Sequence, residues 1–161
     1  MKIIILTLLI LNNFYLVCVH ASEANSIDES AQHNAWLKQQ FSEQHQNLIP
    51  KVAVADMLFA CNQARQIEPV NYKINDLILR MDKNRLAEKL IRCLDTDSMK
   101  SDIALNFGLL GCFEEQLMHL PDAERKQKMA LVKKAINALS HSERKKSFTQ
   151  CVSTQAINYL Q

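Results

Sequence analysis

The sequence predicts an all-α fold, a compact bundle of about six to seven helices stapled by two disulfides. From residue 35 onward, nearly every window has apolar residues at the i, i+3, i+4 spacing of a helix. Only two Gly and three Pro occur in 161 residues, which leaves few residues suited to hairpin turns and counts against an all-β sandwich or barrel. At this length a single domain with its own core is expected.

The N-terminus has the layout of a secretory signal peptide. Lys2 precedes an apolar run over 3–11, and a second apolar run over 14–19 leads to small residues around Ala21. We therefore expect residues 1–21 to be a signal peptide that is cleaved after Ala21. Export predicts a secreted protein, extracellular or, if the source is bacterial, periplasmic.

Two alternatives to cleavage are a retained membrane anchor and lipidation at Cys18. A retained membrane anchor is disfavoured because Asn12 and Asn13 interrupt the apolar run, so no membrane span is expected after signal cleavage. Lipidation at Cys18 is disfavoured because the bulky Val17 stands where a small residue is needed.

The next segment is polar. In residues 22–34, Ile27 is the only large apolar residue, so burial cannot offset the entropy lost on ordering. We expect a flexible polar tail over 22–34 and a single helical domain over 35–161.

The sequence pattern in the first half of that domain predicts three helices. A helix over 35–48 carries Phe41 on an apolar face, and Pro50 suits the first turn of a second helix. Beyond Pro69, apolar residues at one-face spacing predict a third helix over 74–81.

Polar residues suited to N-caps mark the starts of the fourth and fifth predicted helices. Asp82 suits the N-cap of a fourth helix, and the Asp and Ser residues of 95–98 suit a break and the N-cap of a fifth, which carries apolar residues over 103–117. Gly108 and Gly111 lie inside this fifth helix, each at a cost of up to about 1 kcal/mol relative to Ala. We interpret them as sites of close helix packing; contact with a ligand is the alternative.

Two helices complete the chain. Pro121 begins a sixth helix with apolar residues in 3-4-3 spacing over 129–139. Ser140 and Glu143 form an S-x-x-E capping box, which predicts the start of a seventh helix.

Loss of Cys18 with the signal leaves an even number of cysteines, which in an oxidising compartment predicts two disulfides. The four are Cys61, Cys93, Cys112 and Cys151. No pair has C-x-x-C spacing and no His lies within four residues of any of them, so zinc is disfavoured and no metal is expected.

The cysteines follow an internal repeat. Asp82 precedes Cys93 by eleven residues, and Ser140 precedes Cys151 by the same interval, each after an earlier cysteine at the end of an apolar cluster. If the repeat is real, it favours the pairs Cys61–Cys93 and Cys112–Cys151. Chance similarity between helices is the alternative, and the pairing Cys61–Cys151 with Cys93–Cys112 stays open.

The charges are uneven along the chain. A formal net charge of +2 argues against a nucleic-acid partner, although residues 121–161 alone sum to +5. We interpret these basic side chains as a solvated helix exterior, with a face for an acidic partner or membrane surface as the functional alternative. The candidate residues of that face are Arg125, Lys126, Lys133, Lys134, Lys145 and Lys146.

No constellation for catalysis or cofactor binding is found. His119 follows Glu114 and Glu115, but an exposed helix end explains it better than a carboxylate–His pair. The chain also lacks the nucleophile, metal and phosphate-loop motifs, so we expect neither an enzyme nor a cofactor.

Apolar residues allow a second kind of function, an internal pocket for a small hydrophobic ligand. The candidate lining residues are Met57, Phe59, Met81, Phe107, Gly108, Gly111 and Met129. In bulk the chain is similar to insect odorant-binding proteins, but it lacks their pair of cysteines three residues apart on one helix, and we assign it to no family.

We therefore expect a non-enzymatic interaction protein, such as an inhibitor, immunity, effector or venom-type factor, which presents a rigid surface to another protein. A carrier of a small hydrophobic ligand is the alternative. A carrier requires an enclosed apolar cavity, whereas an interaction protein requires a surface patch or groove.

Overall fold

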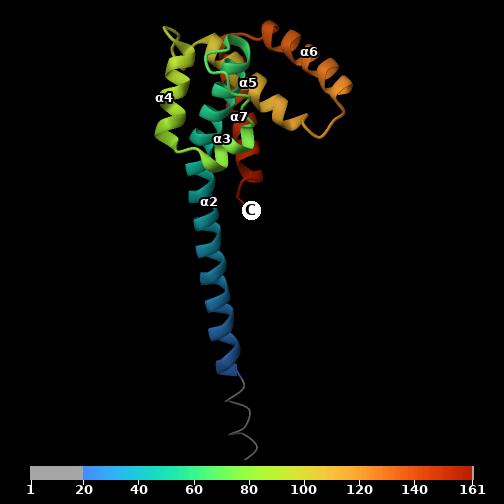
Figure 1. Ribbon diagram of the computed structural model, residues 1–161. Helices are drawn as coiled ribbons and strands as arrows, with labels where there is room; N and C mark the ends of the chain where they lie inside the picture. Colours follow the sequence, from blue (N-terminus) through green and yellow to red (C-terminus); the bar gives the residue numbers. More distant parts are fainter. Residues whose placement is uncertain (1–19, 161) are drawn as a thin grey trace, which may run out of the picture. The chain divides into compact units, whose positions relative to one another are not determined.

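The computed structural model describes the backbone of residues 20–160 and the side chains of residues 31–160 (Figure 1). The described residues contain helices and no strand, which confirms the all-α prediction. Nearly all of the expected signal peptide, with Cys18, lies outside these residues. The six helices are α2 (His20–Arg65), α3 (Ile74–Arg80), α4 (Lys83–Leu94), α5 (Asp102–Gln116), α6 (Asp122–Ala138) and α7 (His141–Asn158).

The chain divides into two units, residues 1–43 and 44–161. The described part of the first unit is helical from residue 20 to residue 43, where a loose tail was expected over 22–34. This stretch lacks Gly and Pro. It also continues a longer helix, so it does not bear the cost of nucleating a helix of its own. All side chains from residue 31 to residue 39 are exposed, including Trp36 and Leu37.

The expected helix break at Pro50 is wrong, because Pro50 lies inside α2. Proline has no N–H, so the carbonyl of Gln46 loses its usual helical donor. Both residues are exposed, which leaves that carbonyl accessible to water. Continuation of the helix then carries Val52 and Ala55, which are fully buried, into the core.

Capping side chains start three of the helices. The Asp82 carboxylate accepts hydrogen bonds from the backbone N–H of Asn84 (2.8 Å), as predicted for the fourth helix. The predicted capping box of α7 is also present, with Ser140 and Glu143 bonding each other reciprocally. The cap of α5 is Ser101, three residues beyond the 95–98 segment to which the sequence analysis assigned it.

The core belongs to the second unit. Helix α5 packs against both α6 and α7, and α5 and α7 lie side by side in Figure 1. The largest fully buried apolar side chains come from α2, α3, α4 and α5, namely Leu58, Leu77, Ile78, Leu86, Leu90, Leu94 and Leu109. Helix α6 contributes only Met129 and Ile136 as buried residues, so most of its surface is exposed.

Candidate functional site

Two disulfides tie the helices together in the favoured pairing. Cys61 of α2 bonds Cys93 of α4, and Cys112 of α5 bonds Cys151 of α7, with Cα–Cα distances of 6.2 and 6.4 Å. Each disulfide therefore joins a cysteine helix to a capped cysteine helix, with one helix between them in the chain. This arrangement excludes the alternative pairing and agrees with the repeat seen in the sequence.

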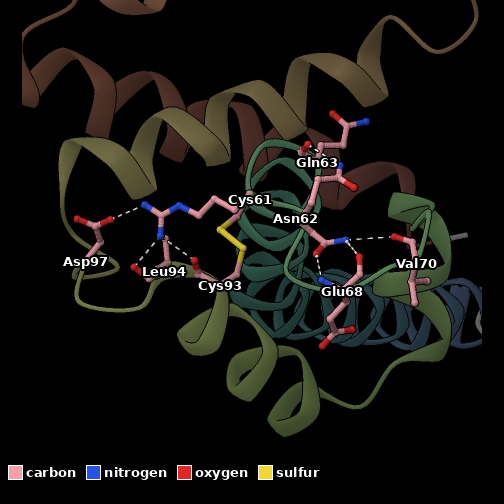
Figure 2. The surroundings of a disulfide bond; sticks show 10 residues. Cys61, Asn62, Gln63, Glu68, Val70, Cys93, Leu94 and Asp97 are labelled. Carbon is pink, nitrogen blue, oxygen red and sulfur yellow. Dashed lines mark hydrogen bonds and ion pairs between the residues drawn. A yellow bond between two sulfur atoms is a disulfide. The ribbon is translucent and has the colours of Figure 1, made fainter.

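Arg65 bonds the C-terminal end of α4, where Cys93, Leu94 and Asp97 lie near the first disulfide (Figure 2). Its guanidinium donates hydrogen bonds to the backbone carbonyls of Cys93 (2.7 Å) and Leu94 (2.8 Å), and to the Asp97 carboxylate (2.6 Å). The last carbonyls of a helix have no partner within the helix and carry partial negative charge. Arg65 satisfies two of them.

Asn62 holds the loop that follows α2. Its side-chain amide donates to the carbonyls of Glu68 and Val70 (both 3.1 Å) and accepts from the Glu68 N–H (2.9 Å), as Figure 2 shows. Phe59, Asn62 and Tyr72 help to line a depression of about 240 Å³ beside this loop. The buried Asn62 has its polar atoms occupied by the loop itself, so the depression has a structural explanation.

Glu68 anchors the same loop to α4. Its carboxylate meets the Lys89 ammonium (2.6 Å), the Tyr72 hydroxyl and, more distantly, Arg92 (3.4 Å). The hydrogen bond from Lys89 is the main cause that lowers the pKa of Glu68. This is a structural ion pair between two largely buried side chains.

A cluster of polar side chains around the buried Asp56 and Gln155 connects α2, α5 and α7. The Asp56 side chain is fully buried, and Gln155 donates a hydrogen bond from Nε2 to its Oδ1 (3.1 Å). The same Nε2 donates to Glu115, whose other oxygen accepts from the Tyr159 hydroxyl. Tyr159 also bonds the side-chain oxygen of Asn75 (2.7 Å). We call Asp56 and Glu115 the acid pair.

Burial dominates the electrostatics of this cluster. Desolvation, with the nearby charge of Glu115, raises the pKa of Asp56 well above its usual value. Desolvation also raises the pKa of Glu115. The pKa of Tyr159 is raised, first by burial and then by the hydrogen bond to Glu115. All three shifts favour the neutral forms.

The acid pair is not among the sites predicted from the sequence. One signal is present, since Asp56 is the only charged residue in the apolar run from Val52 to Cys61. The sequence places Glu115 next to Glu114 and close to His119, which suggests a different grouping. In the structure His119 is exposed, Glu114 pairs with Arg125 (3.5 Å), and Glu115 belongs to the acid pair instead.

The glycines of α5 pack closely, as the sequence analysis preferred. A Cβ at Gly111 would lie 2.3 Å from the backbone oxygen of Asp56, and a Cβ at Gly108 would lie 2.5 Å from the Phe148 ring. Neither distance is compatible with a real Cβ contact. Glycine at both positions lets α5 approach α2 and α7 this closely, and the requirement is stricter at Gly111, where the contact is with backbone.

The residues suggested for an apolar pocket lie in different places. Phe59 borders the depression next to the Asn62 loop, Met129 lines one of about 180 Å³, and Met81 lines one of about 450 Å³ between α3 and α4. Gly108 faces Phe148. Met57 is part of the buried core, and the half-buried Phe107 packs against that core. The structure does not gather these residues around one space.

The basic residues differ in their partners. Arg125 bonds Asp122 (2.7 Å) as well as Glu114, so its charge is neutralised locally. The other five candidates are exposed and make no ion pair within the described part of the chain: Lys126, Lys133, Lys134, Lys145 and Lys146. We call these five side chains the lysine set.

An exposed leucine stands beside part of the lysine set. Leu131 is 64% exposed on α6 and lies three residues, or nearly one turn, before Lys134. Around it α6 presents the small exposed residues Ala130 and Ala135. This face of α6 combines one large apolar side chain, small neighbours and unpaired positive charge.

No family model, curated protein or solved structure matches this chain. Among residues 20–160, no helix is long and apolar enough to cross a membrane. The same residues hold no group of three or more His, Cys, Asp or Glu side chains placed to bind a metal ion.

Proposed function

We propose that this chain is an exported, non-enzymatic interaction protein that binds an acidic protein partner through the lysine set and Leu131. The observation that carries the proposal is that α6 and α7 present five exposed lysines that form no ion pair with any described residue. Positive charge that is unpaired on a surface attracts acidic partners over the distance that salt screening allows.

The two helices that present these residues are both attached to α5. The Cys112–Cys151 disulfide joins α5 to α7, and α6 rests on α5 through Met129 and Ile136. A surface that is ordered before binding loses less conformational entropy when a partner docks. This supports an interaction surface on α6 and α7.

Leu131 offers an apolar anchor for a partner, which the lysines alone do not provide. Rim charges mainly steer association, whereas a well-buried apolar anchor contributes much of the binding energy. A partner segment with acidic residues flanking an apolar pocket would match Leu131 and Lys134 together.

Export is supported by two features. The N-terminal pattern of residues 1–21 is typical of a signal peptide. Two disulfides are typical of proteins that mature in an oxidising compartment. Mass spectrometry of the native mature protein tests this part, and a mature chain that still contains Lys2 would contradict cleavage after Ala21.

The carrier alternative is less well supported. An internal ligand site needs a concave, largely apolar space of about 300 Å³ or more. The candidate residues Phe59, Met129 and Met81 instead border separate depressions. A further depression of about 490 Å³ along α7 is lined by none of the candidates, and its lining includes Lys145 and Thr149. This distribution favours a surface function.

Charge reversal tests the interaction proposal. The immobilised protein is exposed to the extracellular or periplasmic fluid of its source, and captured proteins are compared with those captured by Lys134→Glu/Lys145→Glu. The matched control is Lys83→Glu/Lys100→Glu, which reverses two exposed lysines outside the lysine set.

We expect one captured protein to be retained by the wild type and the control but lost with the Lys134/Lys145 variant. Raised salt should weaken this capture. Recovery of the free chain alone, or equal capture by both double variants, would overturn the proposal.

A further inference from the structure

The acid pair brings two carboxyl groups to a single amide nitrogen. Asp56 on α2 and Glu115 on α5 both accept hydrogen bonds from Nε2 of Gln155 on α7. Asp56 is fully buried and Gln155 is 2% exposed, so water has little access to either side chain. Glu115 is half-buried, and a negative charge on it repels one on the buried Asp56 more strongly than it would in water.

No positive charge bonds the acid pair in the described part of the chain. Tyr159, which follows α7 and donates to Glu115, and Asn75 of α3, which bonds Tyr159, are both neutral. Arg125 and Lys73 border the same depression as Glu115, but Arg125 bonds Glu114 and Asp122, and Lys73 makes no ion pair with Glu115. The acid pair therefore lacks the cation that usually accompanies buried carboxylates.

The cluster is also short of hydrogen-bond donors. Two buried oxygens, Oδ2 of Asp56 and Oε1 of Gln155, have no hydrogen-bond partner among the described atoms. Buried acceptors without donors are costly. A carboxyl group that carries a proton is itself a donor, so one added proton removes a charge and supplies a missing hydrogen bond.

We propose that the acid pair is a proton-binding site and that the bound proton holds the end of α7 against α2 and α5. Helix α7 is tied to α5 covalently at Cys151. Beyond this point, residues 152–160 are attached by the hydrogen bonds of Gln155 and Tyr159, by a bond between His45 and the Ser153 carbonyl (2.7 Å), and by apolar packing. Loss of the proton loosens this segment while the disulfide keeps the rest of α7 in place.

The direction of the pH dependence follows from the sign of the shifts. Burial raises the pKa of Asp56 and of Glu115 above the value of about 4 that a solvated carboxyl group has. Attachment is therefore complete below about pH 4 and weakens as the pH rises through the raised values. An acidic compartment tightens the end of α7, and a neutral or alkaline one loosens it.

Hydrogen exchange of the oxidised full chain tests the proposal. The backbone amides of residues 155–159 are followed at about pH 5 and about pH 8, and their rates are corrected for the intrinsic effect of pH. We expect opening to be at least about tenfold more frequent at the higher pH, because one unit of pKa shift corresponds to a factor of ten. Asp56→Asn, which removes one charge and keeps the shape, should reduce the difference, and Asp56→Asn together with Glu115→Gln, which leaves neither carboxyl group, should reduce it to less than about twofold.

Glu114→Gln is the matched control, because Glu114 is adjacent to the acid pair in sequence but bonds Arg125 instead. It should keep the wild-type pH dependence. If Asp56→Asn does not fold, Glu115→Gln and a carboxyl-carbon NMR titration of the wild type take its place. The proposal is overturned if wild-type exchange is the same at both pH values, if the neutral variant keeps the pH dependence, or if both carboxyl groups titrate near 4.

Discussion

Gly111 lies directly against the backbone of Asp56, so that a Cβ atom at position 111 would meet the Asp56 carbonyl oxygen at 2.3 Å. This contact sets the distance between α5 and α2. It also positions the acid pair, because Glu115 is one helical turn beyond Gly111 on the same helix.

Gly111→Ala should destabilise the protein by about 1–3 kcal/mol, the cost of overpacking a core, even though alanine favours a helix by up to about 1 kcal/mol. The clash is with backbone, which cannot rotate away. Gly108→Ala meets the Phe148 side chain instead and should cost less, because a ring can shift. Urea unfolding of the two variants gives the comparison, and a Gly111→Ala variant as stable as the wild type would contradict the contact.

Peptide mapping should find Cys61 bonded to Cys93 and Cys112 bonded to Cys151. Trypsin separates the four cysteines into different peptides, because basic residues lie between all of them. Without reduction, peptide 52–65 should be linked to 93–100, and 101–125 to 147–161. A link between 52–65 and 147–161 would show the other pairing.

Removal of the second disulfide, by Cys112→Ser together with Cys151→Ser, should lower the free energy of unfolding by about 3–4 kcal/mol. The reason is that the bridge closes a long loop, with a sequence separation of 39, and restricts the unfolded chain. Urea unfolding measures the loss. The matching pair, Cys61→Ser with Cys93→Ser, should lose a similar amount because its separation is 32.

Lys89→Met should lower the free energy of unfolding at neutral pH by about 1 kcal/mol or more. The reason is that the Glu68 side chain, which is only 22% exposed, loses its principal hydrogen-bond donor. The pKa of Glu68 is lowered in the folded protein. Its contribution is therefore present above the unfolded value of about 4.3 and is lost as the pH falls through the folded value. This sign is opposite to that of the acid pair.

The free energies of unfolding of Lys89→Met and of the wild type should therefore become equal in strong acid. Arg80→Met serves as the control, because Arg80 and Asp76 form an exposed ion pair, which contributes little. A Lys89 variant with no loss at neutral pH would show that the pair does not stabilise the loop.

A neutral hydrophobic fluorescent probe should show no saturable enhancement with the folded protein. The reason is that Phe59, Met81 and Met129 border separate depressions and do not share a pocket. Stoichiometric, saturable enhancement at micromolar protein would support the carrier alternative. Protein unfolded in urea gives the background signal.

Local features could be predicted because short-range chemistry determines them. Asp82 and Ser140 cap helices since their side chains reach backbone N–H groups only two or three residues away. The cysteine pairing was favoured because the interval from cap to cysteine repeats. Pro50 was misjudged because the sequence shows the missing N–H but not the burial of Val52 and Ala55, which continuation of α2 provides.

Composition and spacing along the chain are enough to predict the helical class, the start of most helices and the even number of cysteines in the domain. The contact between Asp56, Glu115 and Gln155 depends on helix packing, because these residues are 40 to 99 positions apart where their side chains bond. Helix packing also determines which basic residues lack an ion pair within the described part of the chain, since Arg125 and the lysine set look alike in sequence. Both results depend on which helix faces pack together, and helical periodicity states only that each helix has an apolar face.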